Sequence, residues 1–452
     1  MSAYQTTRKE RFAFPMFTMG LNSCINLING FVLLFYTDFL FLPAAALAVI
    51  MLLVRVFDAV TDPMFGVIFD KLNLKGGKFR PWLRVGMFAV PVTTFMIFAV
   101  PPDMSVTARL ALVVLSYLIA DVAQTITSTP GLSSLSVITS NTNERTKLVG
   151  YIGVADILGM IIVSVILVPQ IERIGFMPVA AIVATIAFFA MATYPFVIRE
   201  RSRETAKIEN NYRLRDILTF FKKNKYLLHF YGFICVFGIF SIPLAPHVIL
   251  HGLGSLDYIA IFTLISIPLL LVVYLTIPSI TKKIDRMKLF KYTMFALVFV
   301  ILAMYFAGYS NPVVLGVFFV IRNTIFMASV ALAVTFAADF VELGHFKTGM
   351  RQEGLTFSAH TFAIKVMLAA SGALAALVLA LIGYDGTLEV QPVESVDMLW
   401  LASNGVPVIG LLLGLPLLLR CKFLCSDIQI MADVNSGKIS REEGLGLLSR
   451  EY

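Results

Sequence analysis

The chain has 452 residues, of which 58% are hydrophobic and 14% are charged, and its mean hydropathy is +0.85. Soluble domains usually contain about 25% charged and about 45–50% apolar residues, so this composition excludes a soluble protein. The apolar runs are long and unbroken, which also argues against a transmembrane β-barrel with alternating segments of about ten residues. We therefore expect an integral membrane protein built from helices.

The apolar runs predict an all-α membrane protein with twelve transmembrane helices. A helix needs about 20 apolar residues to cross a bilayer, and polar or Pro/Gly-containing turns separate runs of that length. The predicted spans are 14–40, 43–69, 82–101, 107–139, 148–169, 177–198, 226–252, 256–280, 289–309, 312–340, 356–383 and 397–419.

The longest polar interruption divides these spans into six and six. It predicts an N-terminal half (1–198), a cytoplasmic linker (199–225), a C-terminal half (226–420) and a cytoplasmic tail (421–452). The linker residues after Asn210 predict a short amphipathic helix on the membrane surface. Two six-helix halves joined by a charged linker resemble the major facilitator superfamily.

Lysine and arginine gather on one side of the predicted bilayer. Every loop on the side of the N-terminus is basic, whereas the opposite side holds only Arg109 and Arg173. The positive-inside rule therefore places both termini in the cytoplasm. The net charge of +8 is explained by topology and predicts no nucleic-acid partner. The first apolar run is too long for a cleaved signal peptide, so we expect a multi-pass protein of the inner cell membrane.

The second predicted span carries charges where lipid is expected. Arg55, Asp58 and Asp62 stand at i, i+3 and i+7, on one face of a helix. One charge at the bilayer centre costs about 2.5–3.5 kcal/mol, so three need partners or an occupant. Na+ prefers hard oxygen ligands such as carboxylates, so Asp58 and Asp62 are the predicted metal ligands. Thr61 lies beside them. The alternative is a structural salt bridge of Arg55 with one carboxylate.

The same stretch is similar to a known family. The run R-x-F-D-A-x-x-D-P-x-x-G-x-x-x-D from Arg55 to Asp70, followed by G-K-F-R-P-W at 77–82, resembles the signature of the glycoside-pentoside-hexuronide:cation symporter family. The segment 338–365 resembles the late-loop motif of that family. The similarity extends from about residue 11 to the C-terminus.

This resemblance implies a coupling-ion site and a sugar site. The family's cation ligands fall on Asp58, Thr61, Asp62 and Thr125. Thr61 replaces an asparagine of the best-known family member, which retains an oxygen ligand and is expected to shift selectivity among H+, Na+ and Li+.

The sugar site matches the family less well. Its first-span aspartate falls on Asn22, its fourth-span aspartate on Ser128, a nearby tryptophan on Leu132 and its fifth-span arginine on Gly153, while its eleventh-span lysine is retained as Lys365. The resemblance therefore implies a sugar transporter without naming the sugar.

Other intramembrane charges allow two interpretations. Asp121 and Asp156 either line the substrate cavity or form structural pairs. Arg322 and Lys365 either attract an anionic substrate or bridge to Asp58 or Asp156. His247 and His251, four residues apart near a helix end, predict a satisfied interfacial pair, with a metal site as the alternative.

The cytoplasmic turn after the second span resembles the conformational latch of the superfamily, with a plain topogenic turn as the alternative. The predicted gating residues are Arg55, Asp70, Lys78 and Arg80.

Together these features predict a monomeric secondary transporter that moves a sugar, glycoside or sugar acid with Na+ or H+ by alternating access. Its partners are the solute, the cation and the lipid bilayer, and it needs no other cofactor. The first alternative is a carrier of amphiphiles or lysolipids on the same fold. The second is a membrane enzyme or receptor, which the short soluble segments and the lack of catalytic motifs disfavour.

Overall fold

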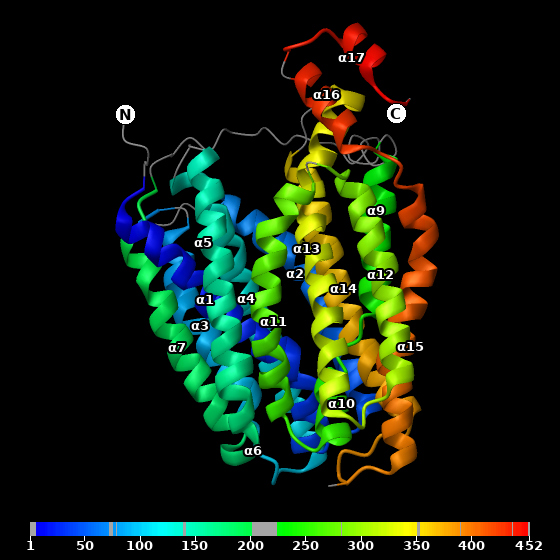
Figure 1. Ribbon diagram of the computed structural model, residues 1–452. Coiled ribbons are helices and arrows are strands. Elements are labelled where there is room, and N and C mark those ends of the chain that lie inside the picture. Colours follow the sequence, from blue (N-terminus) through cyan, green and yellow to red (C-terminus); the bar gives the residue numbers. More distant parts are fainter. Residues whose placement is uncertain are drawn as a thin grey trace. The chain divides into compact units, whose positions relative to one another are not determined.

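The computed structural model describes residues 6–71, 76, 77, 79–138, 142–200, 224–281, 283–349, 353–388, 390–435 and 437–450, with some side chains inside helices outside this description. All regular secondary structure in these residues is helical (Figure 1). Eleven of the described helices are long and apolar enough to cross a membrane. The prediction of an all-helical membrane protein is confirmed, and the second predicted span is also helical.

The first half consists of long helices that match the predicted spans closely. They are α1 (Arg8–Leu34) with a π-helical end, η1 (Phe35–Phe39), α2 (Ala44–Lys71), α3 (Arg80–Phe98), α4 (Val106–Ile138), α5 (Thr142–Met160) with a π-helical end, η2 (Ile161–Leu167), η3 (Val168–Gln170), α6 (Ile171–Ile174) and α7 (Phe176–Val197). Thr7 starts α1 with a capping box, because its side chain accepts from Glu10 N and the Glu10 carboxylate accepts from Thr7 N at 2.8 Å.

The second half differs from the prediction in two helices. Its members are α9 (Lys225–Phe240), α10 (Ala245–Leu253), α11 (Asp257–Ile280), α12 (Arg286–Ala307), α13 (Pro312–Thr348), α14 (Glu353–Leu381) and α15 (Val393–Arg420). The predicted span 226–252 is broken between α9 and α10, where Pro243 and Pro246 oppose a continuous helix. The predicted span 312–340 continues to Thr348, so α13 is about 55 Å long and exceeds a hydrocarbon core of about 30 Å.

The chain forms two compact units. Unit 1 contains residues 1–209, 243–264 and 375–396, and unit 2 contains residues 210–242, 265–374 and 397–452. Unit 1 therefore combines the first six spans with α10 and with the turn after α14, which belong to the second half of the sequence. The division of the sequence at 199–225 stays a prediction, and the amphipathic helix predicted there lies outside the described residues.

Small residues let the helices of unit 1 approach closely. α1 packs against α5 and α7, and α3 packs against α4 and α7 (Figure 1). A Cβ atom on Gly20 of α1 would lie 2.8 Å from the carbonyl oxygen of Ala187 in α7 and 2.9 Å from Met191 Cγ. In a membrane, where lipid is as apolar as a side chain, such close backbone contacts are the main attraction between helices.

Unit 2 has an aromatic core that continues into the C-terminal tail. The ring of Phe230 lies 5.1 Å from Phe336 and 5.5 Å from Phe340, and Phe340 lies 5.3 Å from Phe423 at the start of the tail. The tail forms α16 (Cys425–Asn435) and α17 (Arg441–Leu447). Packing of α16 against the extended end of α13 explains why α13 remains helical beyond the predicted span.

The tail also has polar contacts with unit 2. Cys425 N donates to Asp285 at 2.7 Å, and the Asp285 carboxylate also accepts from Met287 N at the start of α12. Arg286 forms a 2.9 Å salt bridge with Asp339 of α13. The ends of α12, α13 and the tail are therefore joined by directional contacts as well as by aromatic packing.

Gly20 provides a test of the close approach of α1 to α7. Replacing Gly20 with Ala places a methyl group within 2.8 Å of the Ala187 carbonyl, so we expect overpacking to lower the unfolding free energy by about 1–3 kcal/mol. Gly30→Ala is the matched control, because nothing lies within 4 Å of its added Cβ atom. Thermal unfolding of both purified variants measures the difference, and equal midpoints would contradict the packing argument.

Candidate functional site

The predicted cation site begins on α2. The backbone of α2 is helical from Ala44 to Lys71, so positions 55, 58 and 62 share one face as predicted. The side chains of Arg55, Asp58, Asp62 and Asp70 and residue Lys78 lie outside the described part of the structure. Among the side chains that are described, no three His, Cys, Asp or Glu residues form a metal site. The roles of these five residues stay predictions.

The two predicted hydroxyl ligands come from neighbouring helices. Thr61 is half-buried on α2, and Thr125 is buried on α4 with 4% of its surface exposed. α2 packs against α4 in unit 1. The structure thus brings together the two helices that the resemblance implied, and it shields Thr125 from bulk water.

α4 presents three of the predicted site residues on one face. Asp121, Thr125 and Ser128 stand at i, i+4 and i+7 of an uninterrupted helix. Asp121 is 7% exposed and Ser128 is half-buried. This face combines a carboxylate with two hydroxyl groups, a set that accepts hydrogen bonds from a sugar or provides oxygen atoms to a cation.

Asn22 and Asp156 are in direct contact. The Asn22 side-chain amide on α1 donates to the Asp156 carboxylate on α5 at 2.8 Å, and both residues are half-buried. Sequence reasoning predicted both as substrate residues without pairing them. Asp156 lies one turn after Gly153, where the family has an arginine. The family has an aspartate at the position of Asn22. Here the carboxylate next to this position comes from Asp156 on α5.

The predicted basic residues of the substrate site lie in unit 2. Arg322 is half-buried on α13 and has no hydrogen bond or ion pair with any residue that the structure describes. Lys365 is half-buried on α14 and does have a partner. An arginine cannot lose its charge in a protein, so a half-buried guanidinium favours contact with an anion or with water.

Arg80 connects two helices within the first half. Its Nε atom donates to Pro195 O at 2.8 Å and its guanidinium also donates to Phe196 O at 3.2 Å, both at the end of α7. The Glu200 carboxylate accepts from the backbone N–H groups of Phe79 and Arg80 at the start of α3. Arg80 therefore holds the predicted cytoplasmic ends of α3 and α7 together, and its role in gating stays a prediction.

A polar cluster at the opposite end of α1 was missed by the sequence analysis. Asp38 Oδ1 accepts from His251 Nε2 at 2.8 Å and from the Tyr384 hydroxyl, and Thr37 Oγ1 lies 3.0 Å from His247 Nε2. Each histidine has a polar partner at its Nε2 atom, as the predicted pair requires, but the buried Nδ1 atom of His247 has no partner among the described residues, so the prediction holds only in part. Their shared partner Asp38 was not recognised. The signal was present, because Asp38 is a lone carboxylate inside an apolar run.

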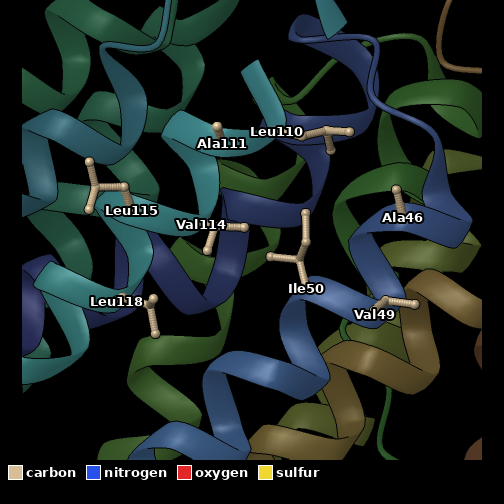
Figure 2. A pocket seen from close by; sticks show the side chains of 8 residues that line it. All are labelled: Ala46, Val49, Ile50, Leu110, Ala111, Val114, Leu115 and Leu118. Carbon is tan, nitrogen blue, oxygen red and sulfur yellow. The ribbon is translucent and has the colours of Figure 1, made fainter. Parts of the chain in front are cut away.

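An apolar pocket lies between α2 and α4. It has a volume of about 660 Å³ and is lined by Ala46, Val49, Ile50, Leu110, Ala111, Val114, Leu115 and Leu118 (Figure 2). All of these side chains are aliphatic, so the pocket offers no side-chain hydrogen bonds to sugar hydroxyl groups. Its chemistry fits hydrocarbon and not a sugar.

The fold defines the protein as a multi-pass helical membrane protein with the architecture of the major facilitator transporters. The solved structure of a D-xylose-proton symporter has the same fold, with a TM-score of 0.62 and 14% identity over 90% of this chain and 96% of that chain. The likeness at this identity concerns the fold alone.

The sequence pattern of the MFS/sugar transport protein family matches residues 11–423, and the chain belongs to that family. It is 24% identical to the inner membrane symporter YicJ of Escherichia coli (strain K12) over 90% of each chain. It is 26% identical to the glucuronide carrier protein homolog of the same strain, over 78% of this chain and 79% of that protein. The resemblance to the glycoside-pentoside-hexuronide:cation symporter family is confirmed, and the chain is a transporter and not an enzyme.

The contact between Asn22 and Asp156 predicts an energetic coupling. Either single substitution, Asn22→Ala or Asp156→Ala, already removes the hydrogen bond between the two side chains, so the double variant cannot lose it a second time. We therefore expect the two changes in unfolding free energy to be non-additive by roughly 1–3 kcal/mol, the value of a hydrogen bond to a charged group. Chemical unfolding of the two single variants and the double variant measures the coupling. Thr185→Ala is the matched partner for a control cycle with Asn22→Ala, since the exposed Thr185 hydroxyl donates only within its own helix. A coupling equal to that of the control would contradict the pairing.

Proposed function

We propose that the protein is a symporter that couples inward movement of Na+ or H+ to uptake of a sugar, glycoside or sugar acid. The single observation that carries this proposal is the match of the family pattern to residues 11–423, which includes the charged second span. In this proposal the protein works in the inner membrane with both termini in the cytoplasm, as the distribution of Lys and Arg predicts.

Four residues are proposed to bind the coupling ion, namely Asp58, Thr61, Asp62 and Thr125. Two carboxylates one helical turn apart repel each other in a medium of low dielectric constant, and a bound cation removes both the repulsion and the cost of burying charge. The buried Thr125 on α4, next to α2, supports a site with little access to bulk water. Coupling then requires that the ion and the solute each raise the affinity for the other, typically by 1–3 kcal/mol.

The solute is proposed to carry a negative charge, as a sugar acid does. Arg322 supports this choice, because it has no ion-pair partner among the described residues although it is half-buried on a membrane helix. A guanidinium forms bidentate hydrogen bonds with a carboxylate or sulfonate. Asp121 and Ser128 on α4 are proposed to contact sugar hydroxyl groups, together with the pair of Asn22 and Asp156. The name of the relative from E. coli, a glucuronide carrier protein homolog, agrees with an anionic sugar.

A second candidate is a carrier of amphiphiles, which the apolar pocket between α2 and α4 favours. A hydrocarbon chain would enter this pocket without losing hydrogen bonds. Stabilisation of the protein by lysolipids but not by sugars or sugar acids would select this candidate over sugar transport.

Neutralising the paired aspartates tests the ion site. Asp58→Asn and Asp62→Asn remove a charged ligand each, so we expect the Na+ affinity to fall at least about tenfold and uphill accumulation to stop, while exchange of solute persists. Na+-dependent thermal shifts and solute uptake in proteoliposomes measure the two effects. The control is Asp103→Asn, which removes an exposed carboxylate in the turn between α3 and α4. Variants that still accumulate solute against a gradient would refute the assignment.

Arg322 provides a test of the anionic substrate. We expect glucuronate or a sulfonated sugar, but not glucose, to raise the thermal midpoint of the wild-type protein in the presence of Na+. Arg322→Gln should reduce the affinity for the anionic sugar by roughly tenfold to a hundredfold, because one charge-assisted contact is lost. Arg173→Gln, at an exposed arginine, is the control. Equal stabilisation of both variants by the anionic sugar would contradict the role of Arg322.

A further inference from the structure

The polar cluster at the end of α1 joins three segments that are distant in sequence. We call Thr37, Asp38, His247, His251 and Tyr384 the outer latch, because the positive-inside rule predicts that this end of the helices is extracytoplasmic. Thr37 and Asp38 belong to the π-helical end of α1, the histidines to α10, and Tyr384 to the turn after α14. All five residues lie in unit 1, so the first half is fastened here to two pieces of the second half.

The segments of the outer latch are in tight contact. A Cβ atom on Gly386 would lie 2.1 Å from Thr37 O, so only glycine fits where the turn after α14 meets the end of α1. On the other side, Arg109 of α4 donates to Leu40 O. The end of α1 is therefore held between its own half and the turn that contains Tyr384.

The carboxylate of Asp38 is the centre of the outer latch. Only 8% of its side chain is exposed, and its Oδ1 atom accepts from His251 Nε2 and from the Tyr384 hydroxyl. A buried carboxylate is costly unless donors surround it, so separation of these segments is favourable only if water replaces the lost donors.

The other charged groups near the outer latch have different contacts. Arg109 binds the Leu40 carbonyl, Glu172 accepts from Ser255 and from the backbone of Leu256, and Asp385 accepts from Thr387. Among the described residues, the two histidines are therefore the groups whose protonation would balance the charge of Asp38.

We propose that the outer latch is a proton-binding site that closes the outer side of the transporter, with His251 as the group that takes up the proton. An imidazolium held against a carboxylate forms an ion pair, which is stronger than the neutral hydrogen bond. Protonation therefore stabilises the closed arrangement, and loss of the proton weakens it. The ligand is H+ itself, at a site separate from the cation site proposed on α2 and α4.

His251 and His247 differ in a way that assigns the proton to His251. His251 lies 2.8 Å from Asp38 Oδ1 and retains 8% exposure of its side chain. His247 lies 3.7 Å from Asp38 Oδ2, is 1% exposed, and its buried Nδ1 atom has no hydrogen-bond partner among the described residues. A proton on that atom would leave a buried donor unsatisfied, so His247 remains neutral and contacts the Thr37 hydroxyl.

The consequence is that low pH favours closure of the outer side. An imidazolium at His251 would hold the Asp38 carboxylate as an ion pair, so the proposal predicts that the closed arrangement weakens as the pH rises. The proposal uses the alternating access that the proposed function includes, but it does not depend on which sugar or coupling ion is moved.

The test measures access to a buried cysteine placed on α10 between the two histidines of the outer latch. Val248→Cys introduces a thiol next to His247 at a position that is 5% exposed, and Met104→Cys introduces a reference thiol at a residue that is 39% exposed. The purified full-length proteins in nanodiscs react with a polar maleimide at pH 5.5 and pH 7.5. The labelling ratio is the rate for Val248→Cys divided by the rate for Met104→Cys, which corrects for the pH dependence of the thiol reaction. We expect this ratio to be several-fold lower at pH 5.5, with a limit of about tenfold per pH unit for one proton.

Variants of the outer latch separate closure from proton binding. Asp38→Asn should raise the labelling ratio roughly tenfold or more and remove its pH dependence. His251→Gln should remove the pH dependence while His247→Gln retains it, and His229→Gln, at a half-buried histidine on α9, should behave as the wild type. If Asp38→Asn does not fold, Tyr384→Phe removes one hydrogen bond to the carboxylate and should raise the ratio at both pH values.

Two results would overturn the proposal. A labelling ratio unchanged by both Asp38→Asn and Tyr384→Phe would show that these contacts do not close the outer side. A pH dependence that survives in His251→Gln would show that the proton binds elsewhere. Because no sugar or coupling ion is used, either failure leaves the proposed symport function untouched, and failure of the Na+ experiments leaves the outer latch untouched.

Discussion

The structure depends on the cost of placing charged and polar side chains inside a bilayer. Each such group needs a partner, because lipid supplies no hydrogen bonds. Asp156 has Asn22, Asp38 has His251 and Tyr384, and these partners come from helices distant in sequence. The polar residues therefore fix contacts between particular helices, in addition to the close packing at Gly20 and the aromatic core of unit 2.

The helix ends are stabilised by a different means. At the predicted cytoplasmic side, the first half is tied by Arg80 to the last turn of α7, and the second half by the Arg286 and Asp339 salt bridge and by the docked tail. These contacts lie within each unit. At the other end, the outer latch joins segments from both halves of the sequence within unit 1. The outer latch therefore differs from the contacts at the predicted cytoplasmic side, because it joins segments that come from both halves of the sequence.

The two proposals place a cation-responsive site and a proton-responsive site in different parts of the chain, with different chemistry. The proposed ion site has paired carboxylates on α2 and hydroxyl groups on α2 and α4, and it is suited to a hard cation. The outer latch has one carboxylate with two imidazoles and a phenol, and it is suited to a proton. A membrane potential or a pH gradient would act on the first through the coupling ion and on the second through the closed state of the outer side.

The sequence by itself determined the class of fold, the predicted spans and the family. It also placed positions 55, 58 and 62 on one helical face, because hydropathy and helical periodicity are local properties. Only the tertiary structure decided which polar groups meet: the pairing of Asn22 with Asp156 and of Asp38 with His251 spans more than a hundred residues, and no local pattern encodes it. The same holds for the continuation of α13, which depends on packing against the tail.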